Sequence, residues 1–520
     1  MTLDHDPIFG KNVIETLSEG MYDNPLFLFR EYVQNAADAI DAAERDGILK
    51  NGAGQIEVVV DKGKRLISFE DNGTGIPKDS VKAMLANIGD SQKDRKTDKG
   101  FRGIGRLGGL GYCQKVCFET SFKGENVKSI FEWDAKNLHE ILADPAEKIH
   151  AGQLIRRITS TWEEKCEKDI HFFKVLLINI NPSCDELLDV EEARRYLSMV
   201  APVPFDYSKF PFVEKIEQFM KEEDLPSLSE YRLHLNTEEV RKGYSSPLEI
   251  EGSKSIEFLD VVCRTLRDDS GKKVGWLWFG VSLFDGVLSK KCWQRALRLR
   301  KANIQIGESD CLANPRREQK LWREDRGNNY FLGEVHALDE SLIPNSRRDY
   351  FNPDNSCRYF EQILKVEFQE LHKLYHDASE VRSSFKTIDE AENAQRDFEE
   401  KDKKGFYNQD ERDKACEKLE IIQKKRVNAE KKLDKITEKL TDPNIDHKPT
   451  MHILNKYSEK LNTKPIVLPP KKPCKKYTEQ NIKQSVRDVL EKVFEVLYKM
   501  LPEEEANLIK DEIAKRFQRK

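Results

Sequence analysis

Close to its N-terminus the chain reads Phe27-Leu28-Phe29-Arg30-Glu31-Tyr32-Val33-Gln34-Asn35-Ala36-Ala37-Asp38-Ala39-Ile40. As a helix, this run has an apolar face made by Phe29, Val33, Ala36, Ala37 and Ile40. Glu31, Asn35 and Asp38, at positions i, i+4 and i+7, share a second stripe. A helix that buries one face and presents carboxylate and amide groups on another predicts a binding site.

Size and composition limit the kind of protein this can be. The 520 residues predict two to four domains, and the net charge of -5 gives no general attraction to nucleic acid. The ten cysteines contain no Cys-x-x-Cys pair, which predicts reduced thiols. Since neither a signal region nor an apolar run of about 20 residues occurs, we expect a soluble cytoplasmic protein without a membrane partner.

An α+β fold is expected from the order of patterns. Residues 55–60 and 66–70 read as a strand pair, and further strands are predicted over 116–122, 129–133, 154–162 and 174–180. Helix, sheet and glycine-rich loops in this order predict a two-layer α/β sandwich over residues 1–185.

The rest of the chain divides by composition. Residues 186–355 again mix a helix (190–199) with strands (274–279 and 298–301), which predicts a second α/β domain. Apolar residues at spacings of three and four then predict a helical hairpin or coiled coil over 356–442, with a turn at 404–408, although Arg426 lies on the seam. A proline- and lysine-rich linker is expected over 443–476 and a helical segment over 477–520.

Two loops carry the candidate binding chemistry. Asp71-Asn72-Gly73-Thr74-Gly75 follows a strand, and a buried carboxylate there can accept a hydrogen bond from an exocyclic amine such as that of adenine. An ordinary Asx-turn is the alternative. Residues 100–112 are unusually rich in glycine, and such a loop can bring N–H groups against phosphate and act as a mobile lid. Neither a P-loop nor a dinucleotide fingerprint is present.

These motifs together resemble the GHKL, or Bergerat-fold, ATPases, which include the 90-kDa heat-shock chaperones, MutL proteins, type II topoisomerases and MORC ATPases. The resemblance rests on Arg30-Glu31-x3-Asn35-Ala36-x-Asp38-Ala39, Asp71-x-Gly73-x-Gly75, the glycine lid and Thr120. It is strongest to the heat-shock chaperones, over residues 8–121. It implies binding of ATP with Mg²⁺ and slow hydrolysis.

The resemblance also implies roles for individual residues. Glu31 would be the general base that activates water, and Asn35 would hold Mg²⁺ through its amide oxygen. Asp71 would bind the adenine amine, with Gly73 and Gly75 allowing the base to approach. Thr120 would support the adenine, and Asp38 would be structural. The ribose and phosphates would be lined by Asn87, Ser91 and Lys93, and the lid would be formed by Gly103, Gly105, Gly108, Gly109 and Gly111.

Family members also place one cation of a transducer domain at the γ-phosphate. The segment Leu342-Ile343-Pro344-Asn345-Ser346-Arg347-Arg348-Asp349 resembles the chaperones' arginine-bearing loop. Arg347 is the best match and Arg348 follows closely. Lys301 is a rival, because MutL and MORC proteins use a transducer lysine.

Two departures bear on the biological role. The lid has one residue more than the chaperone pattern, and the helices beyond residue 359 do not resemble the chaperones' C-terminal domain but are closer in plan to MORC proteins. The resemblance therefore supports ATP hydrolysis well and client-protein folding poorly. The expected function is still a homodimeric, ATP-driven clamp that remodels a protein partner. A DNA-engaging clamp, using Arg295, Arg298, Arg300 and Lys301 or the lysines of 471–476, is one alternative. A nucleotide-switched component of a bacterial defence or stress module is another.

Overall fold

The computed structural model describes residues 9–18, 24–89, 105–250, 254–313, 320–407, 409–440, 448–458 and 484–517. The chain divides into two compact units. The first comprises Met1–Ser282 and Gly286–His372, and the second comprises Leu283–Asp285 and Lys373–Lys520. Within the described ranges, no helix has the length and apolarity needed to cross a bilayer.

The first unit contains an eight-stranded sheet that begins with the predicted strand pair. Its order is β5 (Thr159–Lys165), β4 (Val127–Asp134), β3 (Cys113–Ser121), β6 (Phe172–Ile180), β2 (Leu66–Asp71), β1 (Gln55–Asp61), β7 (Arg232–Leu235) and β8 (Glu238–Glu239). All neighbours are antiparallel except β1 and β7. Because β7 and β8 come from beyond residue 185, this sheet continues past the expected end of the first domain. The division into domains at residue 185 stays a prediction.

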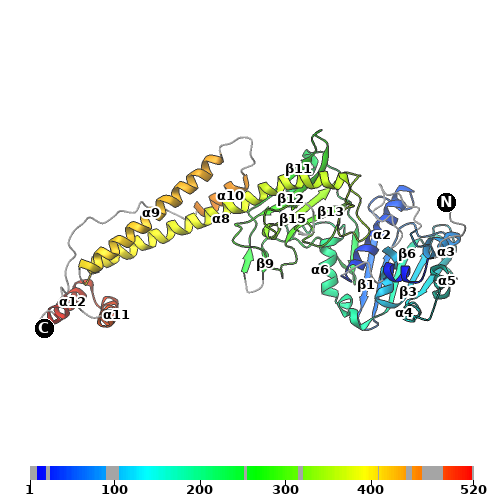
Figure 1. The fold of residues 1–520 in the computed structure, drawn as a ribbon, viewed down its shortest axis with the longest axis horizontal. Helices are drawn as coiled ribbons and strands as arrows, with labels where there is room; N and C mark the ends of the chain where they lie inside the picture. The colour runs from blue at the N-terminus through cyan, green and yellow to red at the C-terminus, as the bar shows by residue number, and fades with distance from the viewer. Residues whose placement is uncertain are drawn as a thin grey trace. The chain divides into compact units, whose positions relative to one another are not determined.

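Helices cover this sheet and form the second layer of the predicted sandwich (Figure 1). Helix α2 (Phe27–Arg45) packs on β1 and β2, and α4 (Ala135–Ala143) packs on β3. The remaining helical elements of this part are α1 (Asn12–Ser18), α3 (Lys78–Ala86), η1 (Gly105–Gly111), α5 (Ala151–Ile158), η2 (Pro182–Leu188), α6 (Val190–Val200) and α7 (Val213–Glu222). The mixed α+β class is therefore confirmed.

One predicted strand is partly wrong. Residues 154–158 belong to the helix α5, and the strand β5 begins only at Thr159. Leu154 and Ile158 are both buried, and their spacing of four residues puts them on one helical face. The pattern of apolar residues over 154–158 was therefore compatible with either structure, and packing of that face selected the helix.

A second sheet lies further along the first unit. Its order is β11 (Asp260–Arg267), β12 (Lys273–Val281), β15 (Leu332–Ala337), β13 (Ala296–Lys301) and β14 (Ile304–Gln305), and β13 runs parallel to β15. A small pair, β9 (Leu248–Ile250) and β10 (Lys254–Ile256), and the short helix η3 (Gly327–Tyr330) accompany it. The strands predicted over 274–279 and 298–301 are confirmed.

A buried charged network joins the second sheet to the helices that cover the first sheet. Glu334 accepts from Lys242 Nζ at 2.8 Å and pairs with Arg300 Nε at 2.5 Å, and all three side chains are fully buried. Burial lowers the pKa of Lys242 to about 8. Arg300 also donates to the backbone carbonyl of Met199 at the end of α6. Because α6 packs on α2, this network connects β13 to the helix that carries Glu31.

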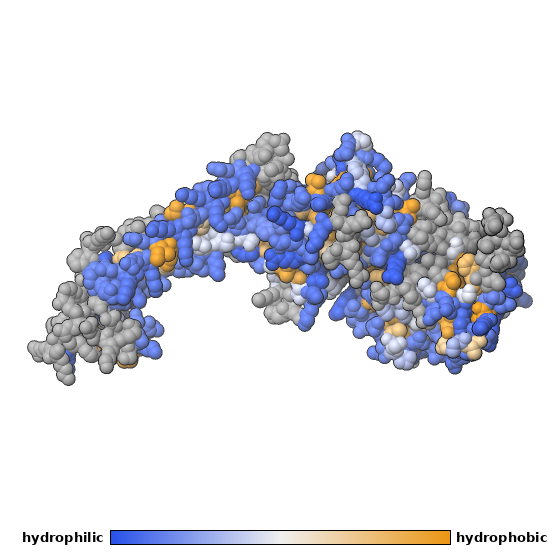
Figure 2. Space-filling view, in the orientation of Figure 1, coloured by the Kyte–Doolittle hydropathy of each residue, from blue (hydrophilic) through white to orange (hydrophobic). Residues whose placement is uncertain are grey.

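The second unit is helical. Most of α8 (Asn355–Lys404) and α9 (Gln409–Lys439) form the predicted antiparallel hairpin, because Asp402 pairs with Arg412 and Glu380 pairs with Lys432. In Figure 2 the surface of this hairpin is mainly hydrophilic, which agrees with the high charge content of its sequence. The chain ends with α11 (Gln484–Met500) and α12 (Glu503–Phe517).

The expected linker over residues 443–476 contains a helix. This is α10 (Lys448–Ser458), whose Ile453 is fully buried and whose Tyr457 stacks on Phe385 with ring centroids 5.5 Å apart. Pro449 is compatible with this helix because proline is tolerated in the first turn. The proline content therefore did not exclude local order.

Candidate active site

Local hydrogen bonds mark both ends of helix α2. The Asn24 side chain accepts from the Leu26 N–H at 3.0 Å just before the first turn. Gly47, with a φ of 71°, follows the last turn, and the Ile48 N–H returns to the Ala43 carbonyl at 2.8 Å. Burial of Phe29, Val33 and Ile40 in the core fixes the rotation of the helix, so the stripe that carries Glu31 and Asn35 has a defined direction.

Glu31 lies in a confined, positively charged environment. It is 5% exposed, and its two carboxylate oxygens lie 3.4 Å from Arg30 Nη2 and 3.5 Å from Arg348 Nε. The Arg30 guanidinium also stacks over the Phe27 ring at 4.4 Å. The two guanidinium groups beside this carboxylate are of the kind that binds phosphate oxygens through planar, paired donors.

The structure brings Arg348, rather than Arg347, to Glu31. Arg348 is mostly buried and has a φ of 53°, whereas Arg347 is exposed. The rival Lys301 donates instead to the carbonyls of Leu338 and Asp339, the latter at 2.6 Å. Adjacent residues on a tight turn point in different directions, so only one of the two arginines can face Glu31 in this conformation. A catalytic role for Arg347 stays a prediction that this geometry does not favour.

Asn35 and Asp38 differ in their surroundings. Asn35 is half-buried one turn after Glu31, and in the described part of the chain its side-chain amide has no hydrogen-bond partner. Asp38 is buried. An amide oxygen beside a carboxylate is a hard oxygen donor of the kind that Mg²⁺ prefers, so the residues present fit the metal that the family implies.

The predicted adenine loop is held firmly against the sheet. Asp71 is buried and accepts from the Gly73 N–H at 2.9 Å. Gly75 has a φ of 66°, and a Cβ there would lie 2.0 Å from the Ser121 carbonyl oxygen, so only glycine fits. Thr120 accepts from the Ile76 N–H at 2.8 Å and donates to the Phe172 carbonyl at 2.9 Å. Thr120 therefore ties this loop to β6, and its contact with adenine stays a prediction.

The described half of the glycine segment packs on α2. A Cβ on Gly105 would lie 2.8 Å from Glu31 Oε2, so this backbone borders the candidate catalytic carboxylate. Gly108 and Gly109 are buried, and the Gly109 N–H donates to the Tyr32 hydroxyl at 3.2 Å. Gly111 accepts from Asn181. The segment from Gly105 on is thus anchored in the core, and its contact with phosphate stays a prediction.

Three of the remaining candidates lie outside the described residues, namely Ser91, Lys93 and Gly103. Asn87 is described at the end of α3, where its side chain is exposed and its carbonyl accepts from Arg106 of η1. The end of α3 and the glycine segment are therefore neighbours. A ribose or phosphate contact of Asn87 stays a prediction.

Sequence reasoning gave no role to two tyrosines beside the site. The Tyr32 hydroxyl donates to the Arg106 carbonyl at 3.1 Å and accepts from Gly109. The Tyr196 hydroxyl is buried and, among described residues, unpartnered; burial raises its pKa, and the nearby Arg30 guanidinium opposes this. A buried phenol on an otherwise apolar helix face needs a polar partner. A hydrogen bond from Tyr32 could therefore have been predicted from the sequence.

The basic cluster considered for DNA is not a surface patch. Arg298 and Arg300 are buried, and Arg298 donates to Gln305 Oε1 at 2.7 Å while Arg300 pairs with Glu334. On β13 every residue from Ala296 to Arg300 is buried, so these two arginines lie inside the protein and not on its surface. The second basic cluster, residues 471–476, lies outside the described part.

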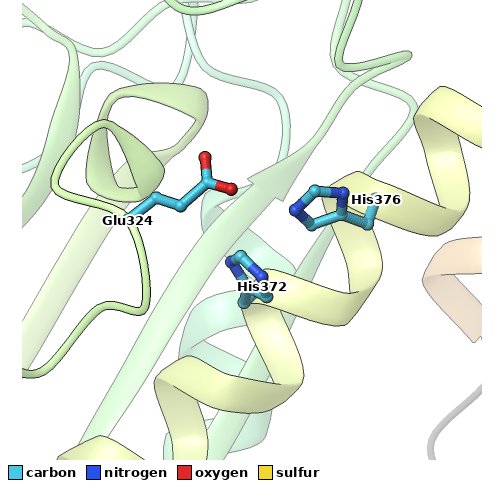
Figure 3. A group of neighbouring side chains, drawn as sticks. All are labelled: Glu324, His372 and His376. Carbon is cyan, nitrogen blue, oxygen red and sulfur yellow. The ribbon is translucent and has the colours of Figure 1, made fainter.

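A further group of potential metal ligands lies away from Glu31. Glu324 and His372 belong to the first unit and offer ligand atoms within 4.8 Å of one another, and His376 follows His372 by one turn of α8 (Figure 3). Glu324 already pairs with Arg326 at 2.7 Å. A carboxylate neutralised by an arginine is a weaker ligand, and we assign no metal here.

Comparison with known proteins agrees with this geometry. Residues 28–161 match the family described as "Histidine kinase-, DNA gyrase B-, and HSP90-like ATPase". This segment contains Glu31, Asn35, Asp71 and Thr120, and it is a GHKL-type ATPase domain close to that of the 90-kDa heat-shock chaperones.

Individual relatives point to the same branch. The chain is 27% identical over 164 residues to the chaperone protein HtpG of Burkholderia cenocepacia (strain HI2424), covering 28% of this chain and 26% of that protein. It is 29% identical over 161 residues to chaperone protein HtpG of Bordetella pertussis (strain Tohama I), covering 27% and 25%. The chain thus spans about a quarter of the length of these curated relatives.

Proposed function

We propose that this protein binds ATP with Mg²⁺, hydrolyses it slowly, and uses the cycle as a conformational clamp. The observation that carries the proposal is the approach of Arg348, which follows the second sheet in sequence, to Glu31 on α2 at 3.5 Å. The arginine comes from a loop after the second sheet, and the general base comes from a helix on the first sheet. Their meeting beside a glycine segment suits a reaction that couples phosphate chemistry to relative movement of the two sheets. Comparing ATP hydrolysis by the wild type and a Glu31 variant tests the proposal.

The residues perform complementary tasks in this mechanism. A carboxylate oxygen of Glu31 orients water and takes its proton as the new oxygen–phosphorus bond forms. The bond from the γ-phosphorus to the bridging oxygen breaks, and ADP and inorganic phosphate result. Arg348 stabilises the negative charge on the transferring oxygens through its planar guanidinium. Asp71 holds the adenine amine, so the base is fixed far from the reacting atoms.

Mg²⁺, when bound, would neutralise charge on the phosphates and fix their orientation, and Asn35 is the residue we expect to hold it. Asn35→Ala is expected to weaken Mg²⁺-dependent ATP affinity by about 10- to 100-fold, the loss of one hydrogen-bonding or ligand contact to a charged group. Titration calorimetry with ATP at saturating Mg²⁺ and in EDTA measures this. If both affinities equal those of the wild type, Asn35 is not a metal ligand.

Clamp action requires that two chains associate when ATP is bound. We expect Glu31→Ala, which would trap ATP, to sediment as a dimer with MgATP and with a clearly different distribution without nucleotide. Sedimentation velocity over a range of protein concentrations measures this, and Asn35→Ala serves as the control that should not respond. An identical sedimentation profile with and without ATP would contradict the clamp.

The partner of the clamp is proposed to be a protein. The two relatives described above are chaperones, and the burial of Arg298 and Arg300 removes one of the two clusters on which DNA binding depended. DNA binding with a steep salt dependence would favour the alternative clamp. A nucleotide-switched defence or stress component would instead show slow turnover and ATP-dependent capture of one specific protein. The cytoplasmic location expected from the sequence stays a prediction.

A further inference from the structure

The turn at residues 306–308, directly after β14, is fixed from inside the second sheet. Gln305 is buried and accepts from Arg298 Nη1 at 2.7 Å. The Gln305 side chain then donates from Nε2 to the Gly307 carbonyl at 2.8 Å. Since Arg298 lies on β13, an interior strand between β15 and β14, these two bonds fix the position of the Gly307 peptide relative to that sheet.

This turn contacts the loop that carries Arg348. The Gly307 N–H donates to the Arg348 carbonyl at 2.7 Å. The Arg348 N–H in turn donates to the Asn345 carbonyl at 3.1 Å, so the loop turns tightly at this point. The backbone of Arg348, at a φ of 53°, is thus held from both sides, and its guanidinium is directed toward Glu31.

The same turn also contacts the start of the catalytic helix. Glu308 Oε1 accepts from Asn24 Nδ2 at 3.1 Å. Asn24 is the residue whose other side-chain atom accepts from Leu26 before α2 begins. Neighbouring residues of one short turn therefore bind both segments that lead to the Glu31–Arg348 pair.

Gly307 is the point at which this arrangement allows no side chain. Its φ is 68°, and a Cβ there would lie 2.4 Å from the Asp349 carbonyl oxygen and 2.7 Å from Cys311 Cβ. The Asp349 carbonyl belongs to the backbone directly after Arg348, so it can move only with that loop. A methyl group at position 307 would push the Arg348 loop away from the turn.

We propose that Gly307 is a positioning residue for ATP hydrolysis and that the 306–308 turn sets the separation of Glu31 and Arg348. This inference rests on the proposed function. It adds that the geometry of the arginine depends on a glycine which touches neither nucleotide nor Glu31. Displacement of a catalytic group by about 1 Å can cost about 100-fold in rate.

Gly307→Ala is expected to lower kcat by about 10- to 100-fold while the Kd for ATP changes by less than about twofold, because the adenine loop is untouched. Gly271→Ala is the matched control. Gly271 also has a positive φ, of 84°, but a Cβ there would meet nothing within 4 Å. The control should share the backbone strain of Gly307→Ala without its loss of kcat. The measurements are phosphate release under ATP saturation and ATP titration calorimetry.

A double variant separates positioning from general damage. If Gly307 acts through Arg348, then Gly307→Ala combined with Arg348→Ala should turn over no more slowly than Arg348→Ala alone. The inference would be overturned if the losses of kcat in the two single variants multiply in the double variant. It would also be overturned if Gly307→Ala and Gly271→Ala have the same kcat. A wild type that releases no phosphate would instead overturn the proposed function.

A second variant keeps the inference testable if Gly307→Ala does not fold. Glu308 is exposed, so Glu308→Ala removes the hydrogen bond with Asn24, together with one negative charge near Arg298, and adds no atom beside the Arg348 loop. It is expected to lower kcat several-fold with ATP affinity unchanged. Unchanged kcat in a folded Glu308→Ala protein would remove the link from the turn to α2.

Discussion

Replacing Glu31 with alanine is expected to slow ATP hydrolysis by about 100- to 10,000-fold, the usual contribution of a positioned general base. Glu31 is the carboxylate that lies between Arg30 and Arg348 and borders the Gly105 backbone. Steady-state phosphate release, with the substrate well above KM, measures the loss.

Binding should survive this substitution. The proposed adenine contact, Asp71, lies on a different element, so the Kd for ATP is expected to stay within about tenfold of the wild type. Asp38→Asn is the matched control, because Asp38 is another buried acid of the same helical stripe. It should retain most of the turnover. A Glu31→Ala protein that hydrolyses ATP as fast as the wild type would show that the base is elsewhere.

Replacing Arg348 with alanine is expected to lower kcat by about 100- to 1,000-fold, similar to the removal of one preorganised donor from a charge-stabilising site. The effect should fall on kcat more than on KM, because charge develops on the phosphate oxygens in the transition state. Single-turnover hydrolysis with excess enzyme isolates this chemical step.

Arg347→Ala provides the control for this experiment. Arg347 carries the same charge one residue earlier but is exposed. It should keep most of its turnover, so the pair of variants distinguishes the two arginines that the sequence left open. If Arg347→Ala loses turnover and Arg348→Ala does not, the loop must rearrange before catalysis, and the sequence match to Arg347 is correct.

Much of the fold could be predicted because its signals are local. The helix over α2 and the strands of the first sheet follow from periodicity and turn residues, and the hairpin of α8 and α9 follows from its spacing and turn. The strand expected over 154–162 was partly wrong because five residues with apolar side chains at 154, 155 and 158 fit a helix or a strand equally well. Tertiary packing, which a single sequence does not reveal, decided between them.

Only part of the candidate site could likewise be predicted from the sequence. Glu31 and Asn35 could be predicted because they share one helix and one motif. Arg348 could not be distinguished from Arg347, because the choice depends on a backbone φ of 53° and on the hydrogen bond from Gly307. Arg298 and Arg300 were misread as surface charge because their partners, Gln305 and Glu334, come from other strands.

The central claim is that Glu31 and Arg348 act together on bound ATP. Single-turnover hydrolysis by the wild type, Glu31→Ala, Arg348→Ala and the double variant tests this most directly. We expect Mg²⁺-dependent hydrolysis by the wild type, large losses in both single variants, and a double variant little slower than the slower single one. Losses that multiply in the double variant, or a wild type that binds ATP without hydrolysing it, would contradict the account.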